Sequence, residues 1–97
     1  MPTPETLHYR TKDGAADYVF EFVTLPSGGE RAYIVRQPPY RGRDEGAHPT
    51  HRLTDGGRKY ICWDSAVRTR ADMKNIASLW ADKTQQYIKT GQAIGVN

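Results

Sequence analysis

The C-terminal third of the chain carries an amphipathic pattern that requires a second structural layer. Thr69 precedes the pattern and Asp72 follows three residues later, which resembles the capping box that begins many helices. Gly91 fits the position just after a helix. One side is an apolar stripe at helical spacing, formed by Met73, Ile76, Ala77, Trp80, Thr84, Tyr87 and Ile88. The polar side carries Asp72, Asn75, Ser78, Asp82, Gln85 and Gln86. The stripe has to be buried, and the remaining sequence offers only strands to cover it.

Residues 18–25 predict a strand, because aromatic and β-branched side chains dominate the segment. Tyr18, Phe20 and Phe22 alternate onto one face of it, which we expect to meet the helix. A Gly-rich turn follows and leads into a returning strand at 30–37. By strict alternation, one face of this second strand carries Ala32, Ile34 and Arg36.

A second hairpin is predicted from segments 51–54 and 58–63, which flank an Asp-Gly-Gly turn. Residues 7–12 alternate weakly and predict an edge strand. Residues 38–50 have no periodicity and are expected to form a long loop. The fold prediction is therefore α+β: an antiparallel sheet of four or five strands, arranged as a meander of hairpins, with one C-terminal amphipathic helix packed on one face.

The 97-residue length predicts a single domain over residues 1–97, in which 1–6 and 92–97 are expected to be disordered. Hydrophobic residues make up only 37% of the chain, but six Tyr, two Trp and two Phe supply large buried surfaces. Cys62 is the only cysteine, so an intramolecular disulfide is excluded. No secretory signal and no membrane-spanning run is visible. We expect a soluble, cytoplasmic protein.

The basic residues are unevenly distributed along the chain. Residues 1–39 hold four basic and five acidic side chains, whereas residues 40–97 hold ten basic and six acidic ones. The candidate partner-binding residues are basic side chains of the second half, together with one tyrosine beside them: Tyr40, Arg41, Arg43, Arg52, Arg58, Lys59, Arg68 and Arg70. At a net charge of +3, ordinary solvated arginines remain the alternative interpretation. Arg68 and Arg70 also lie where a helix N-terminus would favour a phosphate.

Catalytic and metal-binding patterns are weak in this sequence. His48 and His51 lie three residues apart, with Asp55 and Cys62 farther along, but no second paired ligand motif completes a zinc site. Cys62 lies within a predicted strand, away from any helix N-terminus that would activate its thiol. We therefore assign no catalytic residue, no cofactor and no metal from the sequence.

In the order of its elements, segment 51–91 resembles the sheet-reading DNA-binding modules of plant transcription factors and of integrase arm-binding domains. The resemblance implies three strands followed by a helix, and DNA as the partner. The segment lacks the repeated arginine and tryptophan pattern of those strands.

The sequence favours a non-catalytic binding module, an adaptor or inhibitor that docks on a larger protein or nucleoprotein complex. One alternative is direct nucleic-acid binding through the basic residues of the second half. Another is a small hydrolase or nuclease that uses His48 or His51. A free sheet face or edge would also permit a homodimer, and no membrane partner is expected.

Overall fold

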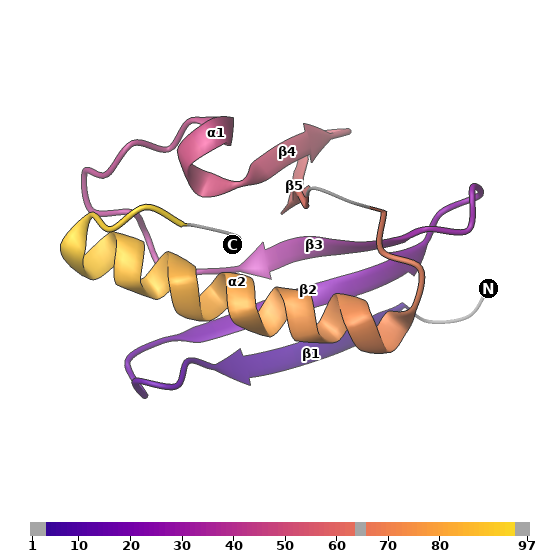
Figure 1. Ribbon diagram of the computed structural model, residues 1–97, viewed down its shortest axis with the longest axis horizontal. Helices are drawn as coiled ribbons and strands as arrows, with labels where there is room; N and C mark the ends of the chain where they lie inside the picture. The colour runs from indigo at the N-terminus through magenta and orange to yellow at the C-terminus, as the bar shows by residue number, and fades with distance from the viewer. Residues whose placement is uncertain (1–3, 64–65, 95–97) are drawn as a thin grey trace.

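The computed structural model describes residues 4–63 and 66–94 of the chain. In these residues a five-stranded antiparallel sheet carries one long helix across one face (Figure 1). The strands are β1 (Glu5–Arg10), β2 (Asp17–Thr24), β3 (Glu30–Arg36), β4 (Arg52–Asp55) and β5 (Arg58–Ile61). The helices are α1 (Ala47–Thr50) and α2 (Arg70–Thr90). The predicted α+β fold with a C-terminal helix on one sheet face is confirmed.

The strand order β1-β2-β3-β5-β4 departs from a simple meander at one place. β5, not β4, lies beside β3, and Tyr33 pairs with Tyr60 there. The reason is the long connection after β3, which brings the chain back so that β4 runs in the same direction as β3. Segment 51–91 consequently contains two strands before the helix, because the third strand of that half of the sheet is β3.

Trp80 of α2 lies at the centre of the main core and is fully buried. Its ring meets Tyr18 and Phe20 of β2 edge-on, with centroids 5.9 Å and 6.0 Å away. The indole nitrogen of Trp80 donates a hydrogen bond to the carbonyl oxygen of Thr50 at 3.0 Å. This one side chain therefore joins the sheet, the long helix and the short helix α1.

The ends of α2 follow the sequence signals. The Thr69 hydroxyl accepts a hydrogen bond from the backbone N–H of Asp72, and Gly91 adopts a left-handed φ of 80°. The predicted apolar stripe is buried except for Ile76, which is half-buried. Gln85, expected on the polar side, is 8% exposed, so that prediction is wrong. Its amide oxygen accepts a hydrogen bond from the Tyr18 hydroxyl, which lets a polar side chain occupy the interface with β2.

A second, smaller core includes residues from the long connection after β3 and from the C-terminal tail, which were expected to be irregular. Tyr40, Tyr87, Ile88 and Ile94 form a buried cluster at the C-terminal end of α2. Residues 92–94 of the expected disordered tail therefore include a buried anchor, and residues 5–6 of the expected disordered N-terminus belong to β1. Residues 1–3 and 95–97 lie outside the described part of the chain.

Segment 38–50 is not wholly a loop, because its last four residues form α1. Pro49 is tolerated there, since N–H groups in a first helical turn have no acceptor within the helix. The Thr50 hydroxyl donates to the carbonyl of Gly46 at 2.6 Å and closes the turn. A helix of four residues is too short to show a periodic pattern in the sequence.

A β-bulge changes which face of β3 Arg36 occupies. Ile34 pairs with Phe20, but Arg36 pairs with Val19, so Val35 is the extra residue. Cross-strand partners share a face, and Arg36 therefore lies on the side away from α2 with Val19. Strict alternation, which places Arg36 with Ala32 and Ile34, is wrong at this position because the bulge shifts the alternation by one residue.

No helix within residues 4–63 and 66–94 is both long and apolar enough to cross a membrane.

The Trp80→Phe substitution should lower the free energy of unfolding by about 1–3 kcal/mol, because the buried carbonyl of Thr50 loses its donor. Urea unfolding followed by circular dichroism measures this loss. Leu79→Ala is the matched control, since Leu79 is the neighbouring residue and is 42% exposed. Equal stability of the Trp80→Phe variant and the wild type would contradict the central position of this hydrogen bond.

Candidate functional site

The sheet face opposite α2, here called the outer face, is covered by neither helix of the described chain (Figure 1). Tyr18, Phe20 and Phe22 point toward α2, so the alternate residues of each strand point outward. The outer face carries Thr6, His8, Arg10, Asp17, Val19, Glu21, Val23, Arg31, Tyr33, Val35, Arg36, Leu53, Asp55, Arg58 and Tyr60. All five strands contribute to it.

Two tyrosines form the centre of the outer face. Tyr33 and Tyr60 are cross-strand partners with ring centroids 6.0 Å apart and planes at 73°. The guanidinium of Arg31 lies 3.9 Å from the centroid of Tyr60, and that of Arg58 lies 4.2 Å from the centroid of Tyr33. Each arginine therefore covers the aromatic ring on a neighbouring strand, in the geometry that favours cation–π attraction.

Carboxylates hold the two arginines in place. Arg31 pairs with Asp55 at 2.9 Å, and Arg58 pairs with Glu21 at 2.9 Å. Arg31 also donates to the Tyr33 hydroxyl at 3.2 Å. Ion pairs that remain partly exposed contribute little stability, but they fix the orientation of the guanidinium groups. Such preorganisation lowers the entropic cost of binding through these side chains.

Exposed apolar side chains accompany the aromatic centre. Val35 is 54% exposed at the bulge of β3, and Leu53 is 42% exposed on β4. Another arginine of the face, Arg36, makes no ion pair with any residue of the described chain. Tyrosine and arginine beside apolar side chains is the composition typical of the energetically important parts of protein interfaces.

The candidate residues from the sequence do not form one surface. Arg58 alone lies on the outer face. Tyr40 is 3% exposed, and its ring packs edge-on to Tyr87 and lies under the guanidinium of Arg52. Arg43 donates hydrogen bonds to the last carbonyls of α2.

The other basic candidates are also scattered. Lys59 is exposed and donates to the Thr54 hydroxyl at 2.7 Å. Arg41 and Arg68 are exposed, Arg41 beside the C-terminal end of α2 and Arg68 just before its start. Whether these residues bind a partner stays a prediction, but the basic surplus of the second half is not one patch in the described residues.

Arg70, at the start of α2, is engaged within the protein. It forms ion pairs with Glu5 of β1 and Glu30 of β3, and its guanidinium lies 5.7 Å from the ring centroid of Phe22. Burial alone raises the pKa of Glu30, but hydrogen bonds from the Thr24 hydroxyl and from Arg70 outweigh it and hold this pKa below 4.5. The arginine expected to attract a phosphate thus connects the helix to the sheet.

His48 lies in α1, and His51 follows the helix directly as its C-terminal cap. The rings of His48 and His51 stack with centroids 6.5 Å apart, and the backbone N–H of Cys62 donates to the carbonyl of His51. Within residues 4–63 and 66–94, no three His, Cys, Asp or Glu side chains are grouped closely enough to share a metal ion.

Local sequence patterns do not bring Arg31, Val35, Arg36 and Leu53 together with Tyr33 and Tyr60. The signal that joins these residues is cross-strand register, which depends on the β3–β5 pairing and the bulge. No protein-family model, no curated protein and no solved structure matches the chain. The function therefore has to be argued from this geometry.

Replacing Glu30 by Gln should lower stability at pH 7 by about 1–2 kcal/mol, because a charge-assisted hydrogen bond to Arg70 is weakened. A carboxyl whose folded pKa is lowered stabilises above its unfolded pKa, and this contribution is lost as pH falls through the folded value. The difference between wild type and variant should therefore shrink below about pH 4.

Urea unfolding at a series of pH values measures this difference. Glu45→Gln, in the exposed part of the loop after β3, is the control that removes a carboxylate outside the network. A difference that persisted unchanged at pH 3 would show that the charge of Glu30 does not stabilise the fold.

Proposed function

We propose that the protein is a non-catalytic binding module, an adaptor or inhibitor that docks on a larger protein through the outer face. The observation that carries this proposal is the Tyr33–Tyr60 pair, held between Arg31 and Arg58 on a sheet face that neither helix covers. A rigid aromatic and arginine centre supplies contact area at low entropic cost.

The size of the face supports the same reading. The molecule measures 39 × 27 × 25 Å, so a face bounded by the two longer extents can accommodate about 800 Å² of contact, the usual share of one partner in a stable complex. The free cysteine supports a reducing compartment, and we place the module in the cytoplasm.

Charge indicates the chemistry of the partner. The outer face holds four arginines and three carboxylates, and each carboxylate is already paired with an arginine: Asp17 with Arg10, Asp55 with Arg31 and Glu21 with Arg58. Arg36 is left to meet an anionic group, so the complementary surface is expected to be apolar with one or more carboxylates. In a symmetric dimer through this surface, the unpaired Arg36 of one copy would face the positively charged outer face of the other. The resulting repulsion disfavours such a dimer.

Direct binding of single-stranded nucleic acid is the second candidate. Bases could stack on an aromatic and guanidinium platform of this kind. Protein docking is preferred, because three of the four arginines are paired with carboxylates within the face and cannot contribute fully to phosphate binding. The two candidates differ in salt dependence, since phosphate contacts weaken steeply with salt.

The Leu53→Glu substitution should abolish partner capture, because it places a charge in the apolar part of the proposed contact. Leu79→Glu is a matched control: Leu79 and Leu53 are both 42% exposed, but Leu79 lies on α2, away from the outer face. Pull-down from native lysate with wild type and both variants, with and without nuclease, identifies the bound protein or nucleic acid.

A protein band retained by wild type and by Leu79→Glu after nuclease, but lost with Leu53→Glu, is the expected result. Arg36→Glu should weaken binding of the purified partner at least tenfold, the loss of one charge-assisted contact. Equal capture by Leu53→Glu would exclude the outer face. If the sample without nuclease yields nucleic acid and no protein partner, binding of single-stranded nucleic acid would replace protein docking as the proposed function.

A further inference from the structure

A pocket at the end of the molecule lies apart from the outer-face centre and is not used by the proposed docking. It is formed where the last turns of α2, the turn between β1 and β2, and the chain after β3 meet. Its volume of about 690 Å³ falls within the range of small-molecule sites, about 300–1,000 Å³. Its polar lining includes Asp17, Arg41, Gln85 and Lys89.

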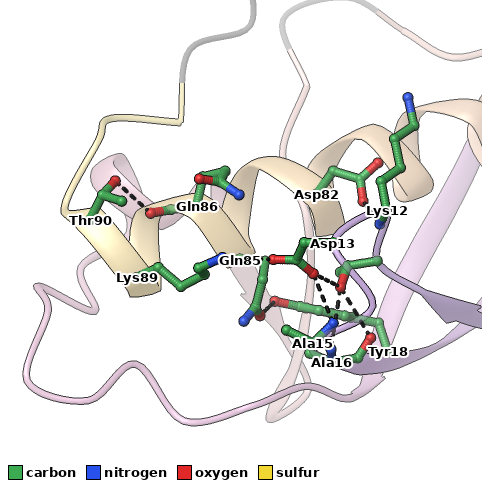
Figure 2. A network of polar contacts seen from close by, with 11 residues as sticks. Lys12, Asp13, Ala15, Ala16, Tyr18, Asp82, Gln85, Gln86, Lys89 and Thr90 are labelled. Atoms are coloured by element: carbon green, nitrogen blue, oxygen red, sulfur yellow. Dashed lines mark hydrogen bonds and ion pairs between the residues drawn. The ribbon is translucent and has the colours of Figure 1, made fainter.

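Gln85 contributes an amide whose donor side is not used by the protein. Its oxygen accepts from the Tyr18 hydroxyl at 3.3 Å, and its nitrogen points away from Tyr18 (Figure 2). The residue is only 8% exposed, and its nitrogen makes no hydrogen bond to any residue of the described chain. The nitrogen is not among the fully buried atoms that lack a partner, so it stays accessible from the pocket and can donate to a ligand acceptor.

Arg41 lies on the rim of the pocket in a constrained position. Its φ of 56° is left-handed, a conformation that residues with side chains rarely adopt. The backbone reversal is held by Arg43, whose N–H donates to the carbonyl of Tyr40 and whose side chain donates to the carbonyls of Ile88 and Lys89. Arg41 thus lines the pocket from a clamped loop, and it forms no ion pair within the described chain.

The charges around the pocket leave one positive group unbalanced. Lys89 pairs with Asp13 at 3.2 Å (Figure 2), and Asp17 pairs with Arg10 at 3.0 Å. Arg43 occupies carbonyls at the negative end of the α2 dipole. Arg41 therefore remains as the cation that an anionic ligand would meet.

We propose that this pocket binds an organic carboxylate. One carboxylate group would bridge the guanidinium of Arg41 and the amide nitrogen of Gln85, and its apolar portion would lie against Pro38 and Ile88. The carboxylate belongs either to a small organic acid or to the C-terminus of a peptide.

The test uses two probes of equal shape, N-acetylleucine and N-acetylleucinamide, which differ only in the carboxylate. Binding to the full chain is followed by ¹H–¹⁵N chemical-shift titration up to about 10 mM, where even a millimolar site is mostly filled. N-acetylleucine should shift the backbone N–H signals of Ala15, Ala16 and Gln85. N-acetylleucinamide should leave them unchanged. A third probe, 4-methylpentanoate, separates the two sources, because it binds equally well only if the peptide group is not needed.

Arg41→Asn should weaken binding of N-acetylleucine about tenfold, since one charge-assisted contact is lost while Asn tolerates the left-handed backbone. Arg68→Asn, which removes another exposed arginine that lies outside the pocket, should leave the affinity unchanged. Gln85→Glu keeps the acceptor for Tyr18 and should abolish binding by repulsion. No shift with any probe, equal binding of acid and amide, or equal loss in both arginine variants would overturn the proposal. None of these outcomes depends on the outer face, which Leu53→Glu tests separately.

Discussion

Burial of the Trp80 indole is the interaction on which the rest of the molecule depends. It brings α2 onto β2 through edge contacts with Tyr18 and Phe20, and its N–H fixes α1 through the carbonyl of Thr50. α1 in turn begins the β4–β5 hairpin, so the position of one indole ring sets where the second half of the sheet can lie. Aromatic contacts supply the apolar burial, and the single hydrogen bond supplies the direction.

A sheet with one long helix leaves one face without a covering layer, and this chain stabilises that face with side chains alone. Arg31 and Arg58 cover the rings of Tyr60 and Tyr33, while carboxylates on neighbouring strands hold the guanidinium groups. In this arrangement Tyr33 and Tyr60 stay partly exposed. The same groups are preorganised for contact, which is why the outer face supports the proposed docking better than the scattered basic residues do.

Most of the basic surplus in the second half is engaged within the fold. Arg43 binds the end of α2, Arg52 covers Tyr40, and Arg70 connects α2 to Glu5 and Glu30. These contacts explain why a chain with a net charge of +3 shows no continuous basic stripe in its described part. Arg36 on the outer face and Arg41 at the pocket remain without ion pairs there, and each lies at one of the two surfaces assigned a ligand.

The sequence by itself determined the elements: the cap at Thr69, the stripe that includes Met73 and Trp80, and the aromatic strand of β2 all depend on local periodicity. It did not determine the β3–β5 pairing, the bulge at Val35 or the burial of Gln85. Those features arise where segments distant in the sequence pack together, because strand register and the hydrogen bonds of buried polar groups depend on residues outside the local segment. Both candidate sites are built from such distant segments, so only the tertiary structure placed them.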